Sequence, residues 1–386
     1  MDRIYLDWNA TAPIRAEALA RMVGTLATTA NPSSVHAEGR KARSLVETAR
    51  QEVARLVNAS ETGVIFTSGG TEAINCALDP RWRVNAAAVE FSRALIGSTE
   101  HAAVLAGGRF DPKLRASLPV DRNGLVEFEA LDRALAATTG RALVAVQLAN
   151  NETGVLQPIP EIGRLVHARG GILICDAVQA AGKVDLDLTA LGADALILSS
   201  HKIGGPQGVG ALVLRDEAVA PGDPLIRGGG QERGHRAGTE AVAAIAGFGA
   251  AAALAQSELH ETARYVRGLR DLIERELLAR LPRAVFFGRT VERVPNTSLI
   301  GLPGAPAATL LMALDLSGFA VSSGSACSSG KVKRSHVLDA MGVDPHLAAS
   351  AIRVSLGRGT SEKDVIRFIE AFEKAVKCLY KRATAA

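Results

Sequence analysis

The chain has 386 residues, of which 47% are hydrophobic and 22% charged, close to the average for soluble globular proteins. At about 100–200 residues per domain, this length predicts two or three domains. The net charge of +4 is scattered along the chain and aromatic residues make up only 4%, so we do not expect a nucleic-acid partner.

The N-terminal residues include acids and lack the apolar core of a secretory signal. The longest apolar stretch, 241–255, is rich in Ala and Gly and too short to span a bilayer, so we expect a buried helix and no membrane partner. The four cysteines are Cys76, Cys175, Cys327 and Cys378; they form no CxxC pair and have no His at zinc spacing. This favours a reducing cytoplasm over a disulfide scaffold or a structural zinc site.

The first long predicted element is a helix over 35–58, in which apolar residues recur at helical spacing after possible caps at Ser33 and Ser34. Short runs rich in β-forming residues follow, separated by helical stretches. These runs are 64–66, 142–148, 171–175, 195–199 and 210–214. Strands that alternate with helices indicate βαβ units and a mostly parallel sheet.

The pattern then restarts with a long charged helix over about 257–281. Further strands are predicted at 297–302, 320–322 and 351–356. A final helix follows Ser361, where Asp364 completes a capping box. We therefore expect an α/β protein with a large domain at 13–258 and a small α/β domain formed by 1–12 plus 259–386.

Ligands of open parallel sheets bind beyond the carboxyl ends of the strands, and three unusual polar sequences lie at such ends. In the first, FTSGGTE, Gly69 and Gly70 let the backbone approach a ligand, and Thr71 opens a helix whose free N–H groups favour an anion. No Gly-Lys-Ser/Thr follows, so the motif is not a P-loop. A glycine turn with a threonine cap explains this motif equally well on its own.

The second sequence is an apolar strand that ends in Asp176. A buried carboxylate needs a cation or good donors, although a helix N-cap is the simpler interpretation of this motif alone. In the third, SSHKIGGP, Lys202 follows a buried strand directly. Desolvation lowers the pKa of a lysine, which suits an imine-forming lysine; a lysine in a surface turn is the alternative.

Together the three sequences supply the parts of a pyridoxal phosphate site. Lys202 would form an imine with the cofactor, and Asp176 would keep its ring nitrogen protonated so that the ring accepts electrons. The helix start at Thr71 would bind the cofactor phosphate.

Further motifs extend this pattern over nearly the whole chain. In chain order the motifs are YLDWNATAP, NPSSVHAEGR, FTSGGTEAIN, EHAAV, NNETGVLQPI, CDAVQAAGK, SSHKIGGPQGVGAL, RGGGQERGHRAGTE, SSGSACSSG and IRVSLGR. The sequence resembles the cysteine desulfurases of the NifS/IscS type. The resemblance implies a fold-type I, class V aminotransferase-like enzyme that uses pyridoxal 5'-phosphate to convert L-cysteine to L-alanine. Its SSGSAC loop is similar to the longer-loop NifS/IscS group rather than to the group of selenocysteine lyases.

The resemblance also implies roles for single residues. Lys202 moves protons, Asp176 pairs with the ring nitrogen, and His101 stacks on the ring and acts in acid–base steps. Asn151 faces both cofactor and substrate, and Arg353 binds the substrate carboxylate. Taken alone, His101 could equally be a satisfied polar residue at a strand end, and Arg353 a strand residue that faces solvent.

The cofactor phosphate and phenolic oxygen have their own implied contacts. The residues implied to hold the phosphate are Gly70, Thr71, Ser199 and His201. Gln179 would bond near the phenolic oxygen, as would Asn151. Thr239 would reach the phosphate of the neighbouring subunit, which implies a homodimer; taken alone, Thr239 is a helix cap.

Cys327 is the candidate nucleophile that receives the sulfur. It lies in a Gly/Ser-rich segment within a catalytic loop at 322–334, whereas Cys175 and Cys76 are predicted in a strand and a helix as small buried residues. Basic residues that follow the loop could favour its thiolate or be ordinary surface charges. These are Lys331, Lys333 and Arg334, and they depart from the family's pattern, as does the segment 79–96.

The resemblance implies that Cys327 passes its sulfur to an iron–sulfur scaffold protein, with which it transiently shares a [2Fe–2S] cluster. Whether the sulfur serves nitrogenase, housekeeping clusters or tRNA thiolation stays open. The alternatives are another reaction of the same cofactor, as in an aminotransferase or a selenocysteine lyase, and a non-catalytic docking protein.

Overall fold

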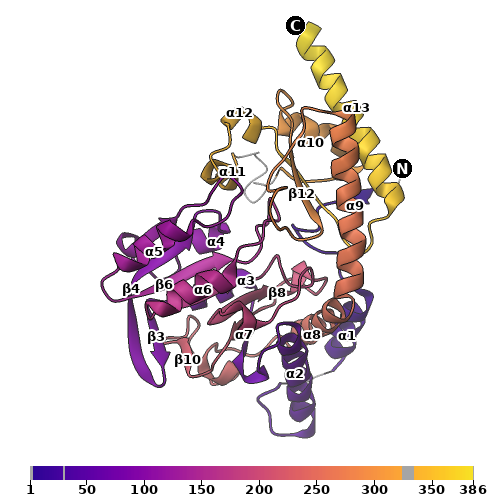
Figure 1. Ribbon diagram of the computed structural model, residues 1–386. Coiled ribbons are helices and arrows are strands. Elements are labelled where there is room, and N and C mark those ends of the chain that lie inside the picture. Colours follow the sequence, from indigo (N-terminus) through magenta and orange to yellow (C-terminus); the bar gives the residue numbers. More distant parts are fainter. Residues whose placement is uncertain (1–2, 29–30, 324–333, 386) are drawn as a thin grey trace.

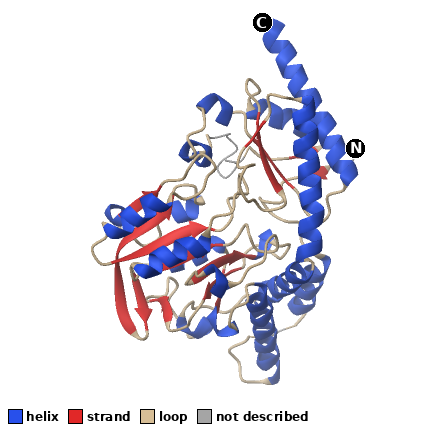
Figure 2. Ribbon diagram, in the orientation of Figure 1, coloured by secondary structure: helices blue, strands red, loops and turns tan. Residues whose placement is uncertain are grey.

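The computed structural model describes residues 3–28, 31–323 and 334–385. Its centre is a nine-stranded mixed sheet in the order β10-β3-β4-β6-β7-β8-β9-β2, with β5 paired to β4 (Figures 1 and 2). The strands are β2 Val64–Thr67, β3 Arg81–Val84, β4 Ala87–Gly97, β5 Arg115–Leu118, β6 Arg141–Gln147, β7 Ile172–Asp176, β8 Ala195–Ser199, β9 Gly210–Leu214 and β10 Val219–Pro221.

The inner strands β4, β6, β7 and β8 run parallel, whereas β9 is antiparallel to both β8 and β2. Strands β7, β8 and β9 are buried at every residue, as their continuous apolar runs require when helices cover both faces. This arrangement confirms the predicted α/β fold with a mainly parallel sheet.

Two apolar layers cover the sheet. The layer with the larger core contains α1, α2, α5, α6 and α8, and the other contains α3 and α4. Their bounds, with that of the short α7, are α1 Ala16–Leu26, α2 Ala37–Leu56, α3 Gly70–Ala77, α4 Ala102–Leu105, α5 Phe128–Ala136, α6 Ile159–Ala168, α7 Leu188–Leu191 and α8 Val242–Ser257. The predicted apolar helix at 241–255 is α8, and its central residues are buried.

A separate apolar core lies at the other end of the molecule (Figure 1). It is formed by the three-stranded sheet β11-β12-β14, the pair β1-β13 and the helices α9, α10 and α13. The bounds are β1 Ile4–Tyr5, α9 Leu259–Arg280, β11 Val285–Phe286, β12 Thr297–Gly301, α10 Ala307–Leu316, β13 Phe319–Ala320, β14 Ile352–Ser355 and α13 Glu362–Ala385. Because β1 pairs with β13, this core supports the proposal that 1–12 and 259–386 form the small domain, whose boundaries stay a prediction.

Of two predicted helix caps, one was confirmed and one was wrong. The Asp364 N–H donates to Ser361 Oγ at 3.1 Å and the Ser361 N–H to Asp364 Oδ2 at 3.0 Å, which is the expected capping box. The cap of α2, however, is His36, whose Nδ1 accepts from the Gly39 N–H, and not Ser33 or Ser34.

The segment 79–96 contains strands that the sequence did not predict. It forms the hairpin β3–β4, whose turn residues Asn85 and Ala86 both have positive φ, of 51° and 66°. Two-residue hairpin turns of this kind favour Asn-Gly, and Asn-Ala lacks that signal.

Two short helices, α11 His336–Ala340 and α12 Pro345–Ala348, follow the undescribed segment and pack against the large core. Among the described helices, none is by itself long and apolar enough to cross a membrane. Helices α8 and α9 would pass on length and composition only as a pair that is bent by 71°.

Candidate active site

The carboxyl ends of the parallel strands open into a cavity of about 540 Å³, called here the main cavity. Most of the predicted site residues line it. These are Gly70, Thr71, His101, Asn151, Asp176, Gln179, Ser199, His201, Lys202 and Arg353. Thr239 does not line it and is exposed in the loop before α8, and Cys327 lies outside the described residues.

One end of the main cavity is the turn from β2 into α3. Gly69 precedes the helix with φ 155° and ψ 177°, and no side chain caps the first turn. The start of β9 packs closely on this turn, since a Cβ at Gly210 would lie 2.6 Å from the Gly69 carbonyl carbon. The free N–H groups of the first turn therefore face a space that suits an anion.

The carboxylate of Asp176 lies at the end of β7, where Oδ1 accepts a hydrogen bond from the Val178 N–H at 2.9 Å. Burial raises the pKa of Asp176, while the Val178 N–H and the neighbouring His101 and Lys202 lower it. A carboxylate in this position can stay ionised when it gains a cationic partner, as a protonated ring nitrogen would be.

Glu100 lies behind Asp176, and both line a small internal space with apolar side chains. Its Oε1 accepts from the Gln147 N–H at 2.6 Å, but its buried Oε2 has no partner among the described residues. Burial, and then the charge of Asp176, raise the pKa of Glu100 well above its ordinary value. The raised pKa favours the protonated form of Glu100 in the folded protein.

The two histidines of the main cavity are neutral. Burial, with the charges of Lys202 and His336, lowers the pKa of His101, although Asp176 opposes this shift. The Ala103 N–H donates to His101 Nδ1 at 3.2 Å, so the ring carries its proton on Nε2. Burial and Lys202 lower the pKa of His201 to about 4.

Lys202 ends a short 3-10 turn directly after β8, as the sequence predicted. Its Nζ donates to the Asn9 carbonyl oxygen at 2.6 Å and to the Ala10 carbonyl oxygen at 2.9 Å. The N-terminal segment thus holds the amine of Lys202 at the cavity wall.

Arg353 is buried and comes from β14 of the small core, so it does not face solvent. Its Nη1 donates to the Asn151 carbonyl oxygen at 3.0 Å and its Nη2 to Asp7 Oδ1 at 2.6 Å. The buried Nε has no partner among the described residues. The guanidinium therefore keeps donor capacity for an anionic ligand in the main cavity.

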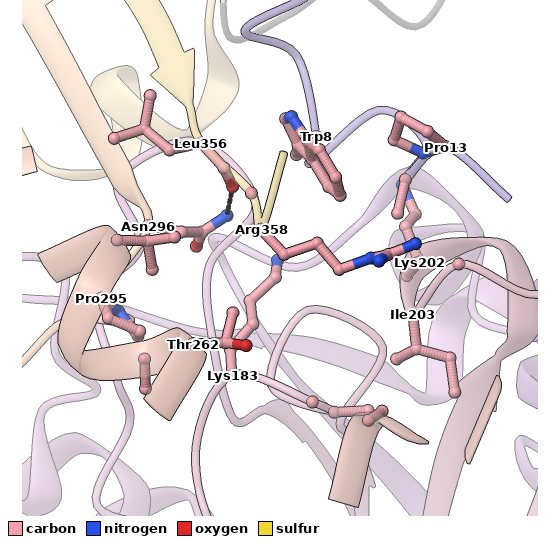
Figure 3. A pocket seen from close by; sticks show the side chains of 18 of the residues that line it. Trp8, Pro13, Lys183, Lys202, Ile203, Thr262, Pro295, Asn296, Leu356 and Arg358 are labelled. Carbon is pink, nitrogen blue, oxygen red and sulfur yellow. Dashed lines mark hydrogen bonds between the residues drawn. The ribbon is translucent and has the colours of Figure 1, made fainter. Parts of the chain in front are cut away.

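A second, smaller cavity meets the main one at Lys202, which lines both. Figure 3 shows it bordered by Trp8, Lys183, Asn296 and Arg358. Lys183 reaches from this side toward the main cavity, where its Nζ donates to Gln179 Oε1 at 2.7 Å.

Several residues that line these cavities had no role in the sequence-based prediction. They are Asp7, Asn9, Glu100, Gln147 and Lys183. The motifs YLDWNATAP, EHAAV and CDAVQAAGK contain four of them, so a polar residue inside a recognised motif was the available signal. Gln147, which closes β6, was predicted only as a strand residue.

None of the cysteines in the described part of the chain lines the main cavity. Burial raises the pKa of Cys76 to about 11 and raises that of Cys175 as well. These two thiols are buried, as predicted, and neither forms a thiolate at neutral pH. Cys378 is exposed on α13.

The segment that contains Cys327 is attached beside the main cavity at both ends. Before it, the Ser322 N–H donates to the Arg353 carbonyl oxygen at 3.1 Å. After it, Ser335 Oγ donates to Glu152 Oε2 at 2.5 Å and His336 Nε2 to the Glu100 carbonyl oxygen at 2.9 Å. Arg334 forms an ion pair with Asp339, while Lys331 and Lys333 lie outside the described residues.

The residues of the main cavity fit pyridoxal phosphate. An uncapped helix start offers donors for a phosphate, Asp176 offers a buried carboxylate for a ring nitrogen, and Lys202 offers an amine. All three face one space of suitable size.

Comparison with known proteins places the chain among described families. Residues 4–368 match the model of the family "Aminotransferase class-V". The chain is 43% identical over 383 residues to a cysteine desulfurase of Cereibacter sphaeroides, covering 97% of this chain and 96% of that protein.

Solved structures of similar proteins support the same family. A NifS-like protein from Rickettsia africae matches with a TM-score of 0.87 at 35% identity, covering 97% of this chain and 99% of that one. SspA, solved in complex with cysteine, matches with a TM-score of 0.73 at 27% identity, covering 92% and 99%. The chain therefore belongs to the class-V aminotransferase family, and within it to the cysteine desulfurases of the NifS/IscS type.

Proposed function

We propose that this chain converts L-cysteine to L-alanine with pyridoxal 5'-phosphate and transfers the sulfur to Cys327. The observation that carries the proposal is the meeting of Lys202, Asp176 and the uncapped start of α3 in one cavity of a chain from the cysteine desulfurase family. Lys202 would form the imine with the cofactor, Asp176 would pair with its ring nitrogen, and Gly70, Thr71, Ser199 and His201 would hold its phosphate.

Bound pyridoxal phosphate would supply an electron sink for the Cα of the amino acid. Lys202 then acts as the base that takes the Cα proton and later returns it. The ring of His101, which carries its proton on Nε2, would cover the cofactor and serve as a proton donor. Asn151 and Gln179 line the same cavity and would bond near the cofactor's phenolic oxygen.

Arg353 would bind the carboxylate of cysteine. Its buried Nε is without a partner among the described residues, and a carboxylate is the acceptor that a guanidinium fork matches best. The existing pair with Asp7 fixes the plane of the fork before substrate arrives. That SspA was solved with cysteine supports an amino-acid thiol as the ligand.

The thiolate of Cys327 would attack the sulfur of the bound cysteine. The Cβ–S bond breaks, a bond between the two sulfurs forms, and a proton replaces sulfur on Cβ, so that alanine leaves and Cys327 keeps a persulfide. The attachment points support this role, because Cys327 is five residues from Ser322 and five residues span at most about 18 Å. Cys76 and Cys175 do not compete with Cys327 for the sulfur, because both thiols are buried and burial raises their pKa values.

The acceptors and the assembly are further parts of the proposal. Cys327 would hand its sulfur to an iron–sulfur scaffold protein in the cytoplasm and transiently share a [2Fe–2S] cluster with it. Two chains would form a homodimer in which Thr239 reaches the partner's phosphate. The exposure of Thr239 supports this, as does the ion pair between Arg236 and Glu72, which joins the loop to the phosphate end of the cavity at 3.0 Å.

The test compares Cys327→Ala with Cys378→Ala in the cofactor-loaded enzyme. Cys327→Ala should keep the yellow colour of the bound cofactor yet lose sulfide release from cysteine with a thiol reductant by at least 100-fold. Cys378→Ala removes an exposed thiol and should behave as the wild type.

Sulfide release that survives in Cys327→Ala would contradict the role of Cys327 and favour another reaction of the same cofactor. A wild-type protein that stays colourless with pyridoxal phosphate would contradict the proposed function as a whole.

A further inference from the structure

Lys183 is a half-buried lysine that lines the second cavity (Figure 3). Its Nζ donates to Gln179 Oε1 at 2.7 Å and to Asn9 Oδ1 at 2.8 Å. Both acceptors are amide oxygens, and no carboxylate is within ion-pair distance of Lys183 among the described residues. A lysine with this pairing has no role in the proposed chemistry.

The orientation of the Gln179 amide is fixed from both of its ends. Its Nε2 lies 2.9 Å from the Asn9 carbonyl oxygen, which can only accept, so this atom of Gln179 must be the donor. The other end of the amide faces the donating Nζ of Lys183, so that atom must be the oxygen. These two contacts therefore fix which atom of the Gln179 amide is oxygen and which is nitrogen.

Asn9 is itself fixed, which makes it a rigid reference for Lys183. Its Nδ2 donates to the Asn151 carbonyl oxygen at 3.1 Å and to Thr297 Oγ1 at 2.9 Å. Its Oδ1 accepts from Asn296 Nδ2 at 3.1 Å as well as from Lys183. Because both amide ends of Asn9 are satisfied, Lys183 must donate to it and cannot accept.

The two acceptors match the donors that Lys183 has in either charge state. Burial, and then the charges of Lys202 and Arg353, lower the pKa of Lys183 well below its ordinary value. With or without its extra proton, the amine has the two N–H groups that the two amide oxygens require.

We propose that Lys183 is a positioning residue that orients the Gln179 amide, so that Gln179 can only donate a hydrogen bond into the main cavity. Gln179 lines this cavity, and only one N–H of its Nε2 is used by a described acceptor, the Asn9 carbonyl. The second N–H is then available to the cofactor's phenolic oxygen. The inference rests on the proposed function, because it needs the cofactor in the main cavity.

A fixed donor at the phenolic oxygen favours the ionised oxygen and disfavours its protonation. Without Lys183, only the Asn9 carbonyl holds the amide, so the amide turns its oxygen toward the cavity more readily, where that oxygen would repel an ionised oxygen. The orientation of a single amide thus sets the pH at which the bound cofactor changes its absorbance.

The experiment titrates the absorbance of the bound cofactor with pH in three variants, Lys183→Met, Gln179→Leu and the double variant. Met keeps most of the length of the lysine and cannot donate. Lys183→Met should raise the titration midpoint by about 1 pH unit, which corresponds to one hydrogen bond to a charged acceptor. Gln179→Leu should raise it similarly, and the double variant should match Gln179→Leu because Lys183 acts only through Gln179.

Lys374→Met, which removes an exposed lysine on α13, is the control and should leave the midpoint unchanged. A purely structural role of Lys183 would lower thermal stability or cofactor affinity without moving the midpoint, and that result would overturn the inference. Shifts that add in the double variant would overturn it too. Failure of the proposed function is distinguishable, because the wild type would then show no cofactor absorbance to titrate.

Discussion

Two walls of the main cavity differ in how their polar groups are paired. The acidic wall, formed by His101 and Asp176 with Glu100 behind them, holds groups whose pKa values are shifted by burial, and one oxygen of Glu100 has no partner among the described residues.

The junction wall, formed by Asp7, Asn9 and Arg353 with Lys183 behind them, joins the two cores through hydrogen bonds between distant parts of the chain. The acidic wall is thus set up for proton chemistry and the junction wall for holding ligands and catalytic groups in place. Substitutions in the first should change rates and pH dependence, and substitutions in the second should change binding.

The largest effect is expected at the acidic wall with Asp176→Asn. The amide keeps an acceptor for the Val178 N–H but removes the carboxylate that would keep the cofactor's ring nitrogen protonated. We expect kcat for alanine formation to fall about 10²–10⁴-fold, with cofactor still bound. Activity within tenfold of the wild type would show that Asp176 is not the partner of the ring nitrogen.

A smaller effect, on binding, is expected at the junction wall with Arg353→Lys. Lysine keeps a positive charge near Asp7 but loses the planar fork, so KM for cysteine should rise about 10–100-fold. Cysteamine, which lacks the carboxylate, serves as the matched ligand, and its affinity should not change. An equal loss for both ligands would mean that Arg353 supports the fold of the site rather than the carboxylate.

The smallest effect is expected for Glu100→Gln, and it concerns stability. The folded-state pKa of Glu100 is raised, so its folded form is favoured when protonated; this stability is fully present below the unfolded pKa of about 4.5 and is lost as pH rises toward the folded pKa. Gln cannot ionise and still accepts from the Gln147 N–H.

The free energy of unfolding of Glu100→Gln should therefore gain on the wild type as pH rises from 5 to 9, by about 1–3 kcal/mol in total. Denaturant unfolding at several pH values measures this difference. A difference that stays constant with pH would mean that Glu100 keeps the same charge in the folded and unfolded states.

Much of the acidic wall and of the sheet could be predicted from the sequence. Strands β7, β8 and β9 were found because each is a continuous apolar run, and Asp176 and Lys202 because they directly follow such runs. The hairpin β3–β4 was missed for two reasons. Its Asn-Ala turn lacks a glycine, and alternate residues of β3 are exposed and polar, so the sequence shows no continuous apolar run there.

The sequence by itself determined the strands β6 to β9, the chemistry available at the strand ends and the family, because these depend on local patterns and motifs. Only the tertiary structure decided that Arg353 faces Asp7, 346 positions away, and that Lys183 faces Gln179 and Asn9. The physical reason is that burial and pairing arise where the two cores meet, and neither the partner of a buried charge nor its loss of solvent is encoded in the residues beside it.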